Sequence, residues 1–479
     1  MLLKRVCGPI MFCAATAMVG PAQTFTTVAR FGGTNGTDPY ADLVQTTNGS
    51  LYGTTQFGGT SHACLLNGAV GCGTIFKITL AGALTTLHSF DSTDGAYPGP
   101  LVPATNGYLY GTTAQGGANK FGTIFKITPA GALTTLYNFC PQAGCPDGAN
   151  PGGLIQAANG DLYGTTIWGG NANFCGGPAL GCGTIFKITP AGALTTLHSF
   201  DGSDGEETNG LMQASDGNLY GTTYGGGTNG AGTIFKITPS GVFTSLHTFD
   251  YGAAPRGGLV EGVDGDLYGT TEDGGIVLDP GNCGGGCGTI FKITPAGVLT
   301  TLYSFVSTDG QNPIGLIQGS DGDLYGTTGA GGSSNCSSGC GTIFKITPAG
   351  ALTTLYLFNS DRYFSATGLV QDTNGDFYGA EGGTFGSPRT YGEVYRFSVG
   401  LGPFVKTLPA VGRVGSGVRI LGTDLTGATS VIFNGTPAAF AVVSPTQIVT
   451  RVPTGATTGK VQVITPSGTL LSNVGFVVP

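Results

Sequence analysis

Acidic residues gather in short glycine-rich segments, where several carboxylates could act together. One segment carries Asp201, Asp204 and Glu206. Related positions are Asp91, Asp94, Glu207, Asp309 and Asp361. Two facing carboxylates could act as acid and base on a glycosidic bond, and several carboxylate oxygens could bind calcium. Asp-Gly is also common in turns, and no segment has the spaced ligands of an EF-hand loop. We therefore expect no cofactor and keep calcium as the alternative.

The single tryptophan, Trp168, lies near Phe174 in another glycine-rich segment. An indole can stack on a sugar ring, and the alternative role is packing against a neighbouring loop. We predict a set of ligand-binding residues on loops and no catalytic residues. The set contains Trp168, Phe174, Asp201, Asp204 and Glu206.

Of 12 cysteines, Cys7 and Cys13 belong to an N-terminal segment considered below. The others form local pairs: Cys64 and Cys72, Cys140 and Cys145, Cys175 and Cys182, Cys283 and Cys287, Cys336 and Cys340. In an exported protein such pairs predict five disulfides that order glycine-rich loops. Zinc is the alternative, but no pair has a paired-histidine partner motif, so we expect no metal site.

Residues 1–22 have the features of a secretory signal peptide. They carry Lys4 and Arg5, an apolar run over residues 10–19 and a small-residue end at 20–22. Nothing later reaches the roughly 18 consecutive apolar residues of a membrane helix. We expect a secreted or cell-surface protein with no transmembrane segment in the mature chain.

Charge and histidine placement exclude several functions. The chain has 19 basic and 27 acidic residues, a net charge of -8, and no basic face, so nucleic acid is not an expected partner. His88, His198 and His247 occupy a repeat position that elsewhere holds tyrosine. No nucleophile or paired-histidine motif accompanies them, so a Ser/His or zinc hydrolase is not expected.

Two sequence blocks repeat along the chain and predict the fold. Leu-Tyr-Gly-Thr begins at Leu51, Leu109, Leu162, Leu219, Leu267 and Leu324, with a degraded copy at Phe377. Gly-Thr-Ile-Phe-Lys-Ile-Thr begins at Gly73, Gly122, Gly183, Gly232, Gly288 and Gly341, and decays at Gly392. A period of about 50 residues rich in β-branched and aromatic residues indicates a β-propeller or β-solenoid.

Each repeat divides into four short strands, as in a propeller blade. The seventh repeat ends at Ser398 without its fourth strand, whereas residues 25–31 match that strand and have no repeat before them. An unpaired edge invites aggregation, so we expect the N-terminal strand to complete the last blade. The prediction is an all-β chain with a closed seven-bladed propeller over residues 23–400.

The paired blocks resemble the GloVer tandem-repeat family of bacterial exported proteins, over residues 25–398. This resemblance implies no established activity or catalytic residue. Residues 401–479 lose the period and alternate as short strands of a sandwich. The stretch Val452-Pro453-Thr454-Gly455 is the part that most resembles an IPT/TIG domain, an immunoglobulin-like fold. This resemblance implies a spacer or an interaction module, and we expect a spacer.

Connections between the second and third strands, and between repeats, vary in length and should share one end of the sheets. Variable loops on a constant scaffold are where binding usually occurs. We predict a non-catalytic binding or adhesion protein that engages a glycan or protein at the cell surface. The alternative is a carbohydrate-active enzyme, lyase or hydrolase, that uses acidic loop residues.

Overall fold

The computed structural model describes residues 23–66, 69–170, 175, 181–250, 252–275, 283–332, 339–358, 367–383 and 390–479. All regular secondary structure in these ranges is β-strand, which confirms the all-β prediction. The described residues include no helix able to cross a membrane. The predicted signal peptide, residues 1–22, lies outside the described residues.

Seven sheets in the described residues hold the repeats, each with antiparallel strands paired in order. The first sheet contains β2 (Val44–Gln45), β3 (Leu51–Thr55), β6 (Thr74–Ile78) and β7 (Leu84–Ser89). The second contains β8 (Ala96–Pro98), β9 (Val102–Pro103), β10 (Leu109–Gln115), β11 (Thr123–Ile127) and β12 (Leu133–Asn138). The third contains β13 (Ala149–Gln156), β14 (Leu162–Trp168), β15 (Thr184–Ile188) and β16 (Leu194–Ser199). A small hairpin of β4 (Leu65–Leu66) and β5 (Ala69–Val70) lies between β3 and β6.

The fourth sheet contains β17 (Glu206–Gln213), β18 (Leu219–Gly225), β19 (Thr233–Ile237) and β20 (Phe243–Thr248). The fifth contains β21 (Val260–Glu261), β22 (Leu267–Thr271), β23 (Thr289–Ile293) and β24 (Leu299–Ser304). The sixth contains β25 (Gln311–Gln318), β26 (Leu324–Ala330), β27 (Thr342–Ile346) and β28 (Leu352–Leu357). The seventh sheet contains β29 (Val370–Gln371), β30 (Phe377–Glu381), β31 (Glu393–Ser398) and the N-terminal strand β1 (Thr24–Arg30). β1 pairs antiparallel with β31, from Thr24 opposite Ser398 to Arg30 opposite Glu393.

The Leu-Tyr-Gly block is explained by contacts on both faces of the second strand. Gly53 leaves room for a ring, because a Cβ there would lie 2.6 Å from Cζ of Phe76. The tyrosine side chain is buried, and its hydroxyl is hydrogen-bonded to the Asn or Asp that opens the preceding turn, four residues earlier. These pairs are Asn48 and Tyr52, Asn106 and Tyr110, Asn159 and Tyr163, Asp216 and Tyr220, Asp264 and Tyr268, Asp321 and Tyr325, and Asn374 and Tyr378. The tyrosine therefore fixes the turn as well as filling the core.

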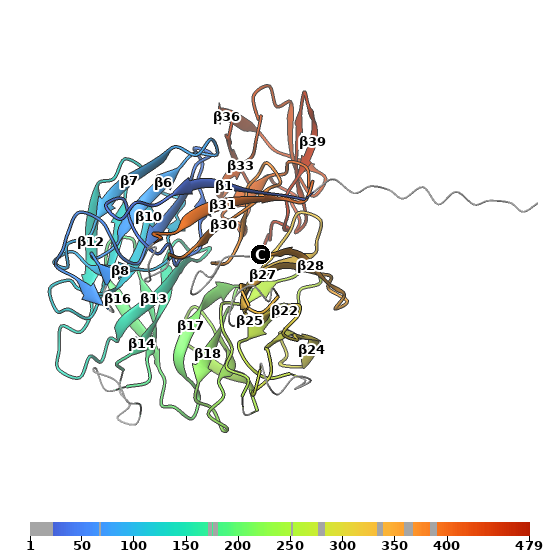
Figure 1. Ribbon diagram of the computed structural model, residues 1–479. Helices are drawn as coiled ribbons and strands as arrows, with labels where there is room; N and C mark the ends of the chain where they lie inside the picture. Colours follow the sequence, from blue (N-terminus) through green and yellow to red (C-terminus); the bar gives the residue numbers. More distant parts are fainter. Residues whose placement is uncertain are drawn as a thin grey trace, which may run out of the picture.

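Apolar clusters join each sheet to the next. One unites Tyr52 of the first sheet with Phe125 of the second, and equivalent clusters follow between every later pair. A further cluster contains Phe76 of the first sheet with Tyr378 and Val394 of the seventh. Figure 1 shows the sheets following one another around a common centre, with β1 beside β31 and β30. The two ends of the repeat region therefore pack together.

The C-terminal part is a two-sheet sandwich, as predicted. One sheet contains β32 (Lys406–Leu408), β33 (Gly417–Leu421), β37 (Gln447–Arg451) and β36 (Phe440–Ser444), and the other β35 (Thr436–Pro437), β34 (Ser430–Phe433), β38 (Val461–Thr465) and β39 (Gly468–Leu471). Val418, Phe433, Val461 and Phe476 are among the buried residues between them.

Instead of extending away as a spacer, the sandwich packs on the tight turns of the repeat sheets. Thr446 Oγ1 donates to the carbonyl of Thr47 at 2.8 Å, and the Thr373 and Thr423 hydroxyls lie 3.1 Å apart. Residues 407–411 line a cavity of about 410 Å³ together with inner-strand residues of several sheets. The C-terminal domain therefore covers part of the turn end of the sheets, which is the end defined by these tight turns.

Phe25 ties β1 to its neighbours, and its removal should weaken the fold. Its ring stacks on Tyr356 with centroids 4.4 Å apart and on Tyr395 at 4.9 Å. Because the ring is half-buried, we expect Phe25→Ala to lower the free energy of unfolding by about 2 to 3 kcal/mol. Urea unfolding measures this, with the exposed Val298→Ala as the control. Equal effects of the two changes would contradict the role given to β1.

Asp372, buried between the seventh sheet and the sandwich, should make stability depend on pH. Burial raises its pKa from 3.8 to about 6, against the opposing effects of the Asn374 backbone N–H and the Lys406 charge. Folding therefore favours the protonated form, and this contribution is lost as pH rises from about 4 through 6. Asp372→Asn should be more stable than the parent at pH 8, by up to about 3 kcal/mol, and similar at pH 4.

Urea unfolding across this pH range checks the prediction. The exposed Asp424→Asn serves as the control, because it removes a carboxyl from the C-terminal sandwich without relieving a buried charge. If Asp372→Asn follows the pH profile of the parent, the carboxyl is not held neutral by burial.

Candidate functional site

The loop end of the sheets, opposite the turn end, carries the connections between second and third strands and those between sheets. Four disulfides lie there: Cys64–Cys72, Cys140–Cys145, Cys175–Cys182 and Cys283–Cys287, with Cα–Cα distances of 4.3 to 5.2 Å. These four predicted pairs are confirmed, and Cys336 of the fifth lies outside the described residues. Each bridge restrains a connection that has few apolar residues of its own.

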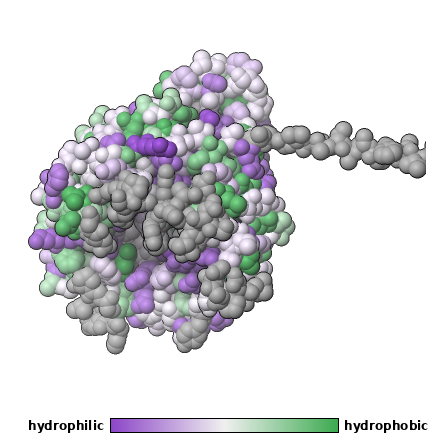
Figure 2. Space-filling model, viewed as in Figure 1, coloured by the Kyte–Doolittle hydropathy of each residue, from purple (hydrophilic) through white to green (hydrophobic). Residues whose placement is uncertain are grey.

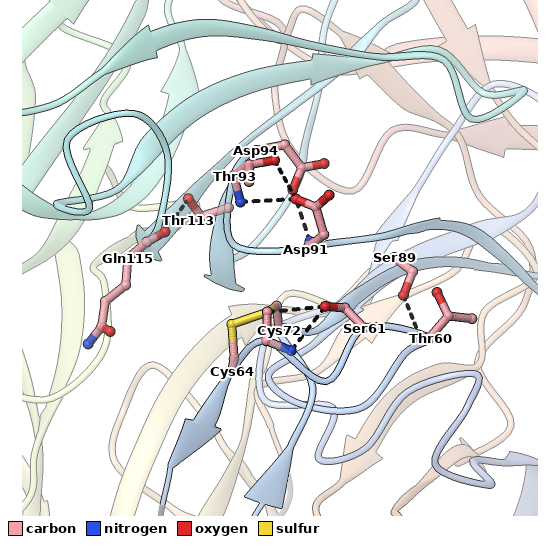
Figure 3. The surroundings of a disulfide bond; sticks show 11 residues. Thr60, Ser61, Cys64, Cys72, Ser89, Asp91, Thr93, Asp94, Thr113 and Gln115 are labelled. Atoms are coloured by element: carbon pink, nitrogen blue, oxygen red, sulfur yellow. Dashed lines mark hydrogen bonds between the residues drawn. A yellow bond between two sulfur atoms is a disulfide. The ribbon is translucent and has the colours of Figure 1, made fainter.

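Neighbouring connections meet at this end. Figure 3 shows the Cys64–Cys72 bridge, with Asp91 and Asp94 of the following connection close by. The carbonyl of Cys72 accepts a hydrogen bond from the backbone N–H of Tyr97, at the start of the next sheet, at 2.9 Å. The loop end is therefore joined from sheet to sheet by backbone contacts.

Asp204, one of the predicted site residues, closes its own connection. Its Oδ2 lies 2.7 Å from Nε2 of His198, and its Oδ1 accepts from the Asp201 backbone N–H at 3.0 Å. The same contact recurs in other sheets, between Asp94 and His88, Asp147 and Tyr137, and Asp309 and Tyr303. A residue that repeats in this way has a structural role in each connection.

Asp201 is exposed and belongs to the same turn. Its Oδ1 accepts hydrogen bonds from the Ser203 hydroxyl at 2.6 Å and the Ser203 backbone N–H at 2.9 Å. The hydroxyl contact is the main reason that the pKa of Asp201 lies below its ordinary value. Asp91 and Thr93 form the same arrangement in the first sheet. Asp201 therefore stays ionised and orders the turn.

Glu206 was predicted in a loop, but it is the first residue of β17, because the strand pairing with β18 extends to Gly225. Its side chain crosses Gly225, where a Cβ would lie 2.8 Å from Oε1. A Glu206 carboxylate oxygen and the sulfurs of Cys175 and Cys182 lie within 4.8 Å of one another. Since those sulfurs form a disulfide, they provide no thiolate for a metal ion.

Trp168 was also predicted in a loop, but it is the last residue of β14, paired with Ala149. Pairing continues to this point because the backbone changes direction only at the two following glycines, which have positive φ. The half-buried indole packs with Ala149, Phe121 and the Cys140–Cys145 bridge. Phe174 lies outside the described residues. The described members of the predicted set thus lie at the loop ends of the third and fourth sheets, with Trp168 against the Cys140–Cys145 bridge and Glu206 near the Cys175–Cys182 bridge.

A second group of polar residues escaped the sequence prediction. Arg256 forms an ion pair with Glu272, whose Oε1 also accepts a hydrogen bond from Asn312 at 3.2 Å. Tyr224, 40% exposed, is near them, and burial raises its pKa with a smaller effect from Glu272. Tyr224 and Glu272 directly follow Leu-Tyr-Gly-Thr-Thr, where the repeats otherwise have unrelated residues. The variation at this position, directly after a constant block, was the sequence signal that could have identified these residues.

The structural role of Asp204 can be tested against its equivalent Asp94. Both Asp204→Ala and Asp94→Ala remove a carboxylate that holds a histidine and a backbone N–H, so each should cost about 1 to 2 kcal/mol of stability. Thermal unfolding of both variants, beside the exposed Glu207→Ala as control, measures this. A loss at Asp94 without one at Asp204 would point to a different role for Asp204.

Several solved structures resemble this chain. A luciferin-regenerating enzyme is 12% identical, covering 80% of this chain and 98% of its own, with a TM-score of 0.42. The extracellular domain of a hybrid two-component system of B. thetaiotaomicron is 13% identical, covering 93% and 54%, with a TM-score of 0.48. PorZ, a surface component of the type-IX secretion system of Porphyromonas gingivalis, is 15% identical, covering 94% and 60%, with a TM-score of 0.49. These likenesses establish no shared function.

Family comparison is more specific. No curated protein matches the chain. The Gloeobacter/Verrucomicrobia repeat matches residues 62–283 and 279–436, which together span most of the chain, and the IPT/TIG domain matches residues 404–478. The chain therefore belongs to the Gloeobacter/Verrucomicrobia repeat family and ends in an IPT/TIG domain.

Proposed function

We propose that this chain is an exported, non-catalytic binding protein whose repeat region is a closed seven-bladed β-propeller. Residues 23–400 form the propeller and residues 401–479 the IPT/TIG domain. The loop end binds a glycan at the cell surface, with a protein ligand as the alternative.

Ring closure is supported by three contacts between the start and the end of the repeat region. The N-terminal strand pairs with β31, and one apolar cluster contains residues of both sheets. Gln45 Nε2 also donates to the Thr373 hydroxyl at 2.9 Å. In another sheet the glutamine at this position contacts the residue that corresponds to Thr373 through a different hydrogen bond, because Gln213 Oε1 accepts from the backbone N–H of Ala158. A repeated contact that also joins the two ends favours a ring over an open solenoid.

The proposal that the loop end binds a ligand rests on the difference between the turn end and the loop end of the sheets. The turn end is uniform, and the C-terminal domain packs on it through contacts such as that of Thr446 with Thr47. The loop end has connections of unequal length that are restrained by disulfides. Restrained loops lose less conformational entropy when a ligand binds, so their order favours recognition.

Export and a polar ligand have separate support. Disulfides persist in oxidising compartments and are rare in the cytosol, so four bridges favour export. The face seen in Figure 2 intersperses hydrophilic and hydrophobic residues. A mixed surface suits a hydroxyl-rich ligand better than an extended apolar partner.

A glycan array with residues 23–479 and a Trp168→Ala variant tests the proposal. We expect the parent to bind a limited set of glycans and the variant to bind them about tenfold more weakly, because a stacking surface is lost. Trp168→Phe keeps part of the packing on the disulfide and should fall between the two. Val298→Ala at the turn end is the control.

Each outcome has a consequence. If Trp168→Ala binds every glycan as the parent does, Trp168 has no stacking role. An array with no signal overturns glycan binding and leaves the protein ligand. New reducing or unsaturated ends after incubation with assorted polysaccharides would replace binding with the alternative, a carbohydrate-active enzyme.

A further inference from the structure

A groove of about 980 Å³ lies where the C-terminal domain faces the second sheet. Its floor comes from β33, β37 and β36, with Arg419, Phe440, Val449 and Arg451 among the lining residues, and Thr105 of the second sheet lies on the other side. The groove is remote in sequence and element from the loop end, so it is independent of the function proposed above.

The groove is positively charged in a chain of net charge -8. Arg419 and Arg451 are its charged lining residues among the described part of the chain, and no carboxylate lines it there. Neither guanidinium forms an ion pair with a described residue. Arg451 Nη1 donates to the carbonyl of Gly415 at 2.9 Å, which leaves its other N–H groups for a ligand.

The register places both arginines on one face of the sheet. Arg419 is opposite Val449, and Arg451 is opposite Gly417, so the two arginines are diagonal neighbours. Diagonal side chains lie about 7 to 8 Å apart, within reach of successive carboxylates on one face of an extended chain. A guanidinium binds a carboxylate through two parallel hydrogen bonds, which gives this charge arrangement a preferred ligand group.

The rim favours a peptide over other polyanions. β36 is an edge strand that pairs only with β37 in the described sheet, so one row of its backbone groups is open. Val442 and Val443 on this strand are 38% and 58% exposed. An extended peptide can use such an edge through backbone hydrogen bonds and apolar contacts, whereas a polysaccharide has no peptide backbone to pair with the edge.

We propose that this groove binds an extended acidic peptide segment, with the carboxylates of alternate residues on Arg419 and Arg451 and the peptide backbone near the β36 edge. The partner is another protein with an exposed segment of alternating acidic and apolar residues. The C-terminal domain then has a binding role of its own, separate from that of the repeat region.

The test uses residues 23–479 and a short fluorescent peptide of alternating valine and glutamate, followed by fluorescence polarisation. We expect binding that weakens at high salt and falls about tenfold in the double variant Arg419→Gln and Arg451→Gln. The matched control is Arg413→Gln, an exposed arginine of the same domain that does not line this groove. A peptide with glutamine in place of glutamate should not bind.

Four results would overturn the proposal: no binding of the acidic peptide, equal binding of the glutamine peptide, equal loss in the control variant, or no loss in the double variant. Polygalacturonate that displaces the peptide and binds more tightly through both arginines would replace the peptide with an acidic polysaccharide. Trp168→Ala should bind the peptide like the parent, because Trp168 does not line the groove. A negative result in this test therefore leaves the glycan proposal untouched, and a negative glycan array leaves the groove proposal untouched. Melting temperatures confirm that the variants are folded.

Discussion

Pairing of the N-terminal strand with β31 is the constraint on which the repeat region depends. Each of the first six sheets takes its outer strand from its own repeat, whereas the seventh takes β1 from the other end of the chain. Without β1, the outer edge of β31 would expose a row of unpaired backbone groups. Arg30 and Thr27 on β1 both bond to the Glu393 carboxylate, and Phe25 stacks on two tyrosines. Side chains thus reinforce a strand pairing between distant segments of the chain.

Within the sheets, constant residues leave the loop end free to vary. The tyrosine and turn residue hold one end of every sheet, and a pair of threonine hydroxyls such as Thr55 and Thr74 bridges the second and third strands near the other. Beyond that threonine pair the repeat imposes little, so connections of different length and different bridges follow. The loop surface can change there at little cost to the scaffold, because the loop residues bury few apolar groups.

Much of this arrangement could be read from the sequence, since strands and their order follow local patterns. The outer-strand role of residues 25–31 was predictable because a repeat strand stood alone. The hydrogen bond between each tyrosine and its turn residue was within reach too, as the two are always four residues apart. By contrast, the extension of β14 to Trp168 depends on pairing with Ala149, and no local sequence pattern predicts this pairing. Docking of the C-terminal domain depends on backbone groups, such as the Thr47 carbonyl, that any sequence supplies.

The degraded seventh repeat is explained by its position between the chain ends. Six sheets have the threonine pair, as at Thr55 and Thr74, whereas the seventh places Glu381 opposite Glu393. A threonine hydroxyl is too short to reach across to the neighbouring outer strand, but the longer Glu393 side chain contacts Thr27 and Arg30 on β1. In the other sheets the outer strand is covalently continuous through a tight turn, so no such contact is needed. In the seventh sheet no tight turn connects β31 to the outer strand, and the side-chain bonds of Glu393 hold β1 in its place. The loss of the threonine motif therefore identifies the sheet in which the two ends of the repeat region meet.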